Sequence, residues 1–235
     1  MRKGGIFHPL GVFLLVLIAG TMVALAASGK IVLNDPEPKT AGRVVEVGTF
    51  NASISGLKVV DINGDVSIVP ANSSVVAVRS NLPINVSLQK GVLTVYCQVK
   101  HGHFGGNLCD DYRNGTVIVE VPGKLDYVKV ENVVGTVYIA AKAANVELSD
   151  IVGTVRGLAW ADYRVSDIVG NVYINVEGKA TICDVVGNVV VAVPSGRGAV
   201  LKAKDVMGKV INDATGNGSV EVSVNDVVGN VEVES

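Results

Sequence analysis

The chain has 235 residues, of which 49% are hydrophobic and only 18% are charged. This length accommodates one domain of ordinary size plus an appendage, and the formal net charge of −2 leaves no basic stripe, which argues against nucleic acid as a partner. Val and Ala supply most of the apolar excess. Because β-branched residues fit a pleated, half-buried surface, the composition favours sheet.

Residues 1–28 form an apolar N-terminal segment. Arg2 and Lys3 precede the uncharged run "LGVFLLVLIAGTMVALAA", which spans about 27 Å as a helix, just short of a hydrocarbon core. The run predicts a hydrophobic helix that is either a signal peptide cleaved after small residues or a retained membrane anchor. In both cases the basic end stays in the cytoplasm. We therefore expect an extracellular or cell-surface protein that is membrane-anchored or secreted.

Five Asn-X-Ser/Thr sequons support export. In an exported chain they are candidate glycosylation sites on surface loops. The sequon asparagines are Asn51, Asn72, Asn85, Asn114 and Asn217.

Residues 29–43, which include "LNDPEPKTAG", are predicted to be a linker. Residues 44–235 are predicted to be a single all-β domain. In its first part, 44–125, runs such as "GVLTVYCQV" and "GTVIVEV" alternate apolar and polar residues between Gly, Asn and Pro. This pattern indicates strands, either less regular rungs or a small antiparallel sheet.

The stretch "CQVKHGHFGGNLC" at 97–109 interrupts this pattern. In an exported protein, Cys97 and Cys109 are expected to form a disulfide, because the flanking strands bring them together across a hairpin. The alternative is a zinc or copper site made by both cysteines with His101 and His103. Their spacing matches no standard zinc pattern, and we predict no cofactor.

The second half, 126–235, repeats one glycine-centred motif. Each unit carries alternating apolar runs on both sides of one glycine, as in "CDVVGNVVV". Self-similarity at 17–21 residues predicts a β-solenoid, a parallel β-helix-like stack of rungs, rather than a helical repeat. The central glycines are Gly64 in an outlying copy, then Gly135, Gly153, Gly170, Gly187, Gly208 and Gly229.

Each glycine is expected to occupy the positive-φ position of a type II turn at a rung corner. An aspartate precedes most of these glycines by three residues, and it can close an Asx turn. Alternatively, the stacked carboxylates bind a cation such as calcium. These aspartates are Asp150, Asp167, Asp184, Asp205 and Asp226.

An outward-facing stripe is the best ligand-binding candidate. Tyr138, Arg156 and Tyr173 each stand three residues after a glycine, so that they form one column across three rungs. Trp160 and Tyr163 lie in the adjoining connection. Aromatic rings with an arginine can hold a sugar ring or another protein; alternatively, they only shield the strand below.

The last unit, "VNDVVGNVEVES", is expected to form the open end of the stack. Val231 and Val233 would point inward, and Glu232 and Glu234 would charge the outward face. Such an edge can accept a strand from another copy or from a partner, or it can fray without a partner.

The segments "INGDVSIVP", "GVLTV" and "GTVIVEVPGKLDYVKVENVVGTVYI" resemble the adhesin-like, or auto-transporter adhesin, family over about residues 50–235. The resemblance implies a β-solenoid domain of unknown function in bacterial and archaeal surface proteins, and it transfers no catalytic residue. The sequence holds neither a Ser/His/Asp arrangement nor a phosphate-binding loop. We therefore predict a non-catalytic extracellular protein of adhesion or cell-surface assembly. The alternative is a metal-dependent or carbohydrate-active surface protein that uses the 97–111 loop or the aspartate column.

Overall fold

A computed structural model of the chain describes residues 38–100 and 106–235. The described residues belong to one compact unit, Pro38–Ser235. The predicted N-terminal helix and most of the predicted linker lie outside the described residues. Within those residues, no helix has the length and apolar character needed to cross a membrane.

This unit is all-β. Its only described helix is η1, a single 3-10 turn at Leu108–Asp111. The strands of the first part are β1 (Lys39–Thr40), β2 (Val45–Phe50), β3 (Gly56–Asn63), β4 (Asp65–Pro70), β5 (Val76–Ser80), β6 (Ile84–Gln89), β7 (Val92–Cys97), β8 (Tyr112–Arg113) and β9 (Thr116–Val121). The strands of the repeat region are β10 (Leu125–Val134), β11 (Val137–Ile139), β12 (Ala143–Val152), β13 (Val155–Val169), β14 (Val172–Val186), β15 (Val189–Ala192), β16 (Ala199–Met207), β17 (Val210–Asn212), β18 (Val220–Val228) and β19 (Val231–Glu234).

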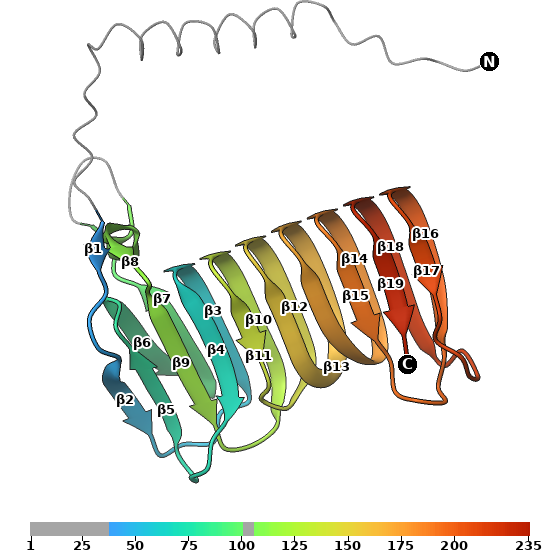
Figure 1. Cartoon of the computed structure of the whole chain (residues 1–235). Coiled ribbons are helices and arrows are strands. Elements are labelled where there is room, and N and C mark those ends of the chain that lie inside the picture. Colours follow the sequence, from blue (N-terminus) through green and yellow to red (C-terminus); the bar gives the residue numbers. More distant parts are fainter. Residues whose placement is uncertain (1–37, 101–105) are drawn as a thin grey trace, which may run out of the picture. The chain divides into compact units, whose positions relative to one another are not determined.

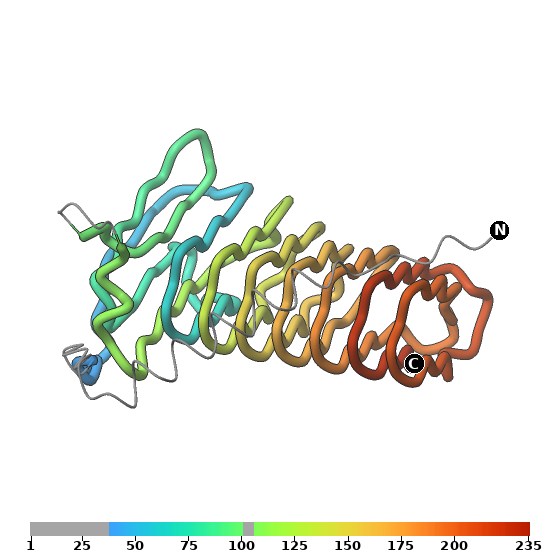
Figure 2. The backbone as a smooth tube through the Cα atoms, turned by 90° about the horizontal axis from the view of Figure 1, so that it is seen from above, coloured from blue at the N-terminus to red at the C-terminus, as the bar shows by residue number. Residues whose placement is uncertain are grey.

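The predicted fold class of the described domain, a β-solenoid, is wrong. All strands except the pair β1–β8 belong to one 17-stranded sheet, which curls into a nearly closed barrel shape (Figure 2). β13 and β14 each run for 15 residues through the bend, and their pairing continues from one wall of the sheet to the other, with register shifts between Gly157 and Tyr163. Alternating Val residues fit a stack of separate rungs and a curled sheet equally well, and only the hydrogen-bond path distinguishes them.

The two walls of this sheet are built from successive repeats. The strand residues before each glycine lie in one wall and those directly after it lie in the other (Figure 1). Neighbouring repeats pair in parallel, as in Val155↔Val172 and Val172↔Val189. Equivalent residues of the repeats therefore form columns that run along the molecule.

The core lies between the walls and consists mainly of Val, Ile and Leu at alternate strand positions. The residue two places after each glycine forms one of its columns. Full burial of such a side chain contributes roughly 1.5–3 kcal/mol. The members with no exposed surface are Val66, Val137, Val155, Val172, Val189 and Val231.

Residues before the repeats include antiparallel pairs. β2 pairs with β5, β5 with β9, and β6 with β7, all antiparallel, whereas β7 and β9 pair in parallel with β3 and β4. Both alternatives left open for residues 44–125 are therefore present: strands paired in parallel with the repeats, and antiparallel pairs, of which β6–β7 is a hairpin.

The last two repeats lie in reversed order. β18 pairs with β14 on one side and with β16 on the other, and β19 lies likewise between β15 and β17. The expectation that the last unit is the open end is wrong, since both of its strands pair with a neighbour on each side. The outermost strands at this end are β16 and β17 (Figure 1).

Candidate functional site

Each corner between the walls contains two residues with positive φ. The aspartate has φ near +55°, for example +57° at Asp167, which is the left-handed region that Asp and Asn enter most readily. The predicted role was an Asx turn, but among the hydrogen bonds of the described residues there is none in which one of these aspartates accepts from the N–H group two residues on. The sequence missed this role, although an Asn at the equivalent position, Asn132 with φ +54°, points to the same conformation.

The corner glycine is required by close approach as well as by its φ. Gly170 has φ +145°, and a Cβ atom there would lie 1.7 Å from the carbonyl oxygen of Gly153 in the neighbouring repeat. Adding a side chain would therefore force the two repeats apart. The same contact with a neighbouring backbone occurs at Gly64, Gly135, Gly153, Gly187, Gly208 and Gly229.

The asparagine after the glycine joins the corners to one another. Asn171 Oδ1 accepts a hydrogen bond from the N–H of Asn188 at 3.0 Å. Asn188 Oδ1 accepts in turn from Asn230 at 3.1 Å, and Asn230 Oδ1 accepts from Lys209 at 3.0 Å. Each link joins spatial neighbours, so this ladder follows the reversed order of the last two repeats.

The aspartate column is exposed at all five predicted positions. Across residues 38–100 and 106–235, no group of three or more His, Cys, Asp or Glu side chains converges in a way that could hold a metal ion. The backbone conformation of the corner accounts for the aspartates without calcium.

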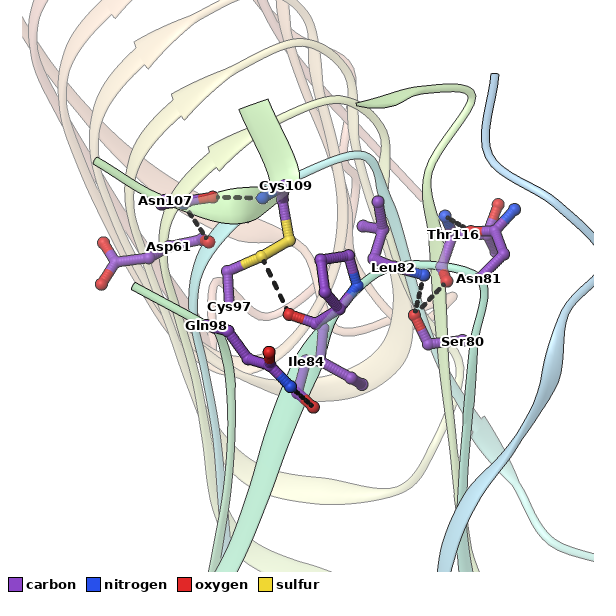
Figure 3. Close-up of a disulfide and its surroundings, with 11 residues drawn as sticks. Asp61, Ser80, Asn81, Leu82, Ile84, Cys97, Gln98, Asn107, Cys109 and Thr116 are labelled. Carbon is purple, nitrogen blue, oxygen red and sulfur yellow. Dashed lines mark hydrogen bonds between the residues drawn. A yellow bond between two sulfur atoms is a disulfide. The ribbon is translucent and has the colours of Figure 1, made fainter. Parts of the chain in front are cut away.

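The 97–109 loop is closed by a disulfide between Cys97 and Cys109 (Figure 3). Both cysteines are almost fully buried. Asn107 caps η1 by accepting from the N–H of Cys109 at 2.8 Å, and it donates to the carbonyl of Asp61 at 2.7 Å. The loop is thereby attached to the first corner of the sheet.

The disulfide removes both thiolates from the alternative metal site. His101 and His103, the other two candidate ligands, lie outside the described residues. The described part of the loop therefore supplies no thiolate ligand for zinc or copper.

The predicted aromatic stripe forms one column on the outer side of the sheet. Tyr138 pairs with Arg156, and Arg156 pairs with Tyr173. The Arg156 guanidinium carbon lies 5.5 Å from the centre of the Tyr173 ring, within the range of a cation–π contact. We call Tyr138, Arg156 and Tyr173 the aromatic column.

The two remaining residues predicted beside this stripe point in opposite directions. Trp160 is 44% exposed, whereas Tyr163 is 3% exposed and its hydroxyl donates to the carbonyl of Ala159 at 2.8 Å. Burial raises the pKa of Tyr163 above its usual range. Tyr163 is therefore a core residue. Tyr163 is separated from the inward-facing Val155 by an even number of residues. Strand alternation therefore predicts that Tyr163 points inward, and this signal was available in the sequence.

A groove on the other wall was not predicted. It has a volume of about 550 Å³ and is lined mainly by outward-facing residues of β3, β10, β12, β13 and β14. No sequence motif contains these residues, because they become neighbours only when the strands pair in register. Its charged and polar side chains come from Lys58, Tyr127, Lys129, Asn145, Glu147, Asp162, Arg164, Lys179 and Thr181.

One lysine of the groove is paired with two carboxylates. The Lys129 ammonium lies 3.0 Å from Glu131 and 3.3 Å from Glu147, and hydrogen bonds to these two carboxylates raise the pKa of Lys129. Asp162 accepts from the N–H of Lys179 at 2.8 Å. The groove therefore presents both signs of charge on its outward surface.

A ridge of half-exposed apolar residues follows the corners. The residue directly before each glycine pairs with its equivalent in the next repeat, as in Val152↔Val169. Contiguous exposed apolar surface often marks a binding region. This valine ridge comprises Val134 (50% exposed), Val152 (51%), Val169 (54%), Val186 (53%), Val228 (50%) and Met207 (73%).

The five sequon asparagines are all exposed. Asn217 Oδ1 accepts from the N–H of Ser219 at 3.1 Å. Their side chains are accessible for modification, and glycosylation itself stays a prediction.

No protein-family model matches the chain, and no curated protein matches it in sequence. Solved structures similar to it include a proposed cell adhesion protein from Clostridium sporogenes, with 16% identity, a TM-score of 0.41, and coverage of 82% of this chain and 97% of that one. A proposed adhesin from Bacteroides fragilis has 10% identity and a TM-score of 0.36, covering 83% and 99%. A proposed lipid-binding protein from Parabacteroides distasonis has 11% identity and a TM-score of 0.36, covering 85% and 97%.

Proposed function

We propose that this protein is a non-catalytic binding protein of the cell surface that acts in adhesion or surface assembly. The main observation that supports this proposal is the aromatic column. Tyr138, Arg156 and Tyr173 project from three hydrogen-bonded strands, and side chains on strands are held more rigidly than side chains on loops. A fixed row of aromatic rings with an arginine is suited to a ring-shaped or planar ligand group, such as a sugar.

Further support comes from the outward surface as a whole. The valine ridge adds apolar contact area at the corners, and the polar groove adds hydrogen-bonding groups of both charges on the other wall. The placement at the cell surface rests on the apolar segment and the sequons of the sequence.

The binding role is tested with beads that carry the full chain and are applied to envelope preparations from the source organism. Arg156→Ala combined with Tyr173→Ala should weaken retention by about tenfold or more, because arginine and tyrosine are frequent energetic centres of interfaces. The matched control is Lys202→Ala, an exposed outward residue of β16. Equal retention of the double variant and the parent would remove the aromatic column as the binding site.

Location has its own test. Protease added to intact cells should remove the protein while cytoplasmic marker proteins survive. Survival of the intact protein under conditions that degrade a known surface protein would contradict a cell-surface role.

A further inference from the structure

The segment that comprises residues 220–235 is inserted between two other parts of the same sheet. β18 lies between β14 and β16, and β19 lies between β15 and β17 (Figure 1). Backbone hydrogen bonds form on both sides. Gly187 donates to Val228, and Gly229 donates to Met207, at 2.9 and 3.0 Å.

The side chains of this segment fill the core. Its inward residues are at most 1% exposed, and they are Val220, Val222, Val224, Val227, Val231 and Val233. Among the described residues, β16 pairs in register with β18 and β17 pairs with β19. Residues 220–235 therefore fill a slot between β14–β15 on one side and β16–β17 on the other, and they also hold β16 and β17 in the sheet.

One loop connects the segment to the rest of the described sheet. This loop, 213–219 with the sequence "DATGNGS", is mostly exposed. Gly216 and Gly218 both have positive φ. Glycines that adopt unusual φ values also allow a chain to change its path, so the loop can act as a hinge.

A second copy of the chain carries an identical segment. If that segment entered the slot in place of the copy's own, every backbone hydrogen bond and every valine contact would be formed again. Such an exchange needs no new interface, which is why it is a low-cost route to association.

Direct edge-to-edge pairing of two copies through β16 is less favourable. Lys202 and Lys204 both point outward from this edge strand, with side chains 66% and 77% exposed. Lys202 is ion-paired with Glu221 and Lys204 with Asp205. In an antiparallel pair of two β16 strands, the lysines of the two copies would still lie opposite or beside each other, which is unfavourable. The chemistry of this end therefore favours exchange over simple stacking.

We propose that copies of this chain join by exchanging residues 220–235, so that β18 and β19 of one copy fill the slot between β14–β15 and β16–β17 of another. Reciprocal exchange gives a closed dimer, and successive exchange gives an open chain of copies. The exchange would be the mechanism of the assembly role proposed above. Its biological role rests on that proposed function, whereas the exchange itself can be tested independently.

A native cysteine makes the exchange measurable. Cys183 in β14 is the free cysteine of the described residues, and it pairs in register with Asn225 in β18. Neighbouring strands lie about 4.8 Å apart, within the Cα separation that a disulfide allows. In Asn225→Cys, the bond between residues 183 and 225 forms within one copy when the segment is in its own slot, and between copies after exchange.

The experiment equilibrates full-length Asn225→Cys at rising protein concentration in mild denaturant, removes the denaturant and oxidises the protein. Non-reducing gels and peptide mass spectrometry then identify the bond. The matched control is Ser166→Cys, because Ser166 of β13 pairs with Cys183 from the other side and takes no part in the exchange. We expect covalent dimers and larger species that grow with concentration for Asn225→Cys, and monomers alone for the control.

Monomeric Asn225→Cys with an internal 183–225 bond at every concentration would overturn the exchange. A second variant, Cys183→Ser with Lys202→Cys and Ser223→Cys, tests the position of the hinge, since residues 202 and 223 are paired. Links between copies place the hinge at 213–219. Links only within a copy would mean that β16–β19 move together, which contradicts the proposal as stated. A negative result in either case leaves the bead-binding test of the proposed function unaffected.

Discussion

At the scale of single residues, each of the five residues in the recurring motif "DVVGN" has its own structural role in the corner. Asp adopts the left-handed conformation, the first Val enters the core, and the second Val joins the exposed ridge. Gly permits contact with the neighbouring backbone, and Asn accepts a hydrogen bond from the next corner. Because every corner needs all five roles, the five residues recur together.

The glycine can be tested against a matched position. Gly170→Ala should destabilise the protein by about 3 kcal/mol or more, because the new Cβ would overlap the Gly153 carbonyl and the residue would be strained at positive φ. At Gly178 the nearest atom to a new Cβ is the Asp162 carboxylate oxygen, 3.0 Å away on a side chain. Gly178→Ala should therefore cost less than about 1 kcal/mol. Urea unfolding of both variants measures the difference, and equal midpoints would contradict the close-approach role.

Cys183 offers a pH-dependent prediction. Burial, followed by the hydrogen bond and negative charge of Asp184, raises the pKa of the Cys183 thiol above its usual value of 9.0. Since the thiolate is the reactive form, alkylation by iodoacetamide should be slow near pH 8 and accelerate only above pH 9. Asp184→Asn removes the negative charge beside the thiol, so the increase in alkylation rate should occur at lower pH. The stability linked to the neutral thiol is present below pH 9 and declines as the pH rises through the folded-state pKa. Rapid alkylation of the native protein at pH 7 would contradict the shift.

At the scale of elements, local sequence favours strands, while register decides which side chains meet. β13 illustrates this: its alternation places Trp160 outside and Tyr163 inside. Gly157 makes room for the inner ring, since a Cβ there would lie 2.5 Å from the Tyr163 hydroxyl. The polar groove likewise exists only because residues from five strands, β3, β10, β12, β13 and β14, are brought side by side.

The disulfide is the covalent element of the irregular first part. It closes a loop with a sequence separation of 12, for which chain entropy gives about 3 kcal/mol of stabilisation. Cys97→Ser combined with Cys109→Ser should lower the free energy of unfolding by about this amount. The parent treated with reductant should unfold at the same denaturant concentration as the double variant. A parent whose stability does not change on reduction would show that the bond is not formed or does not stabilise the fold.

At the scale of the whole molecule, the reversed order of the last repeats decides which strands are outermost. Val210 of β17 is 43% exposed, whereas its neighbour in register, Val231 of β19, is fully buried. The end formed by β16 and β17 therefore has an incompletely covered core. Such regions open locally at low free-energy cost.

Hydrogen exchange followed by mass spectrometry tests this order directly. Backbone amides of residues 199–212 should exchange faster than those of residues 220–234, because the outermost strands have one neighbour and the inserted strands have two. Repeats stacked in chain order would give the opposite result. Faster exchange in 220–234 would therefore contradict the inserted position of the last repeat.

The sequence by itself determined what depends on nearest neighbours along the chain. Alternation of Val with polar residues specifies strands with one buried side, and the recurring glycine marks the corners. Its spacing also aligned Tyr138, Arg156 and Tyr173 in one column, as the register shows. A pair of cysteines in an exported chain was sufficient to predict the bond that closes the 97–109 loop, which the structure contains.

Only the tertiary structure decided how the repeats are joined. That the sheet is continuous and curls into a nearly closed barrel, and that the repeat around Gly229 lies between those around Gly187 and Gly208, depends on which strand edges meet. The repeats have nearly the same sequence, so their edges offer nearly the same hydrogen bonds and apolar contacts. Local pattern therefore cannot distinguish one neighbour from another, and the packing of the whole chain, with the paths of its connecting loops, makes the choice.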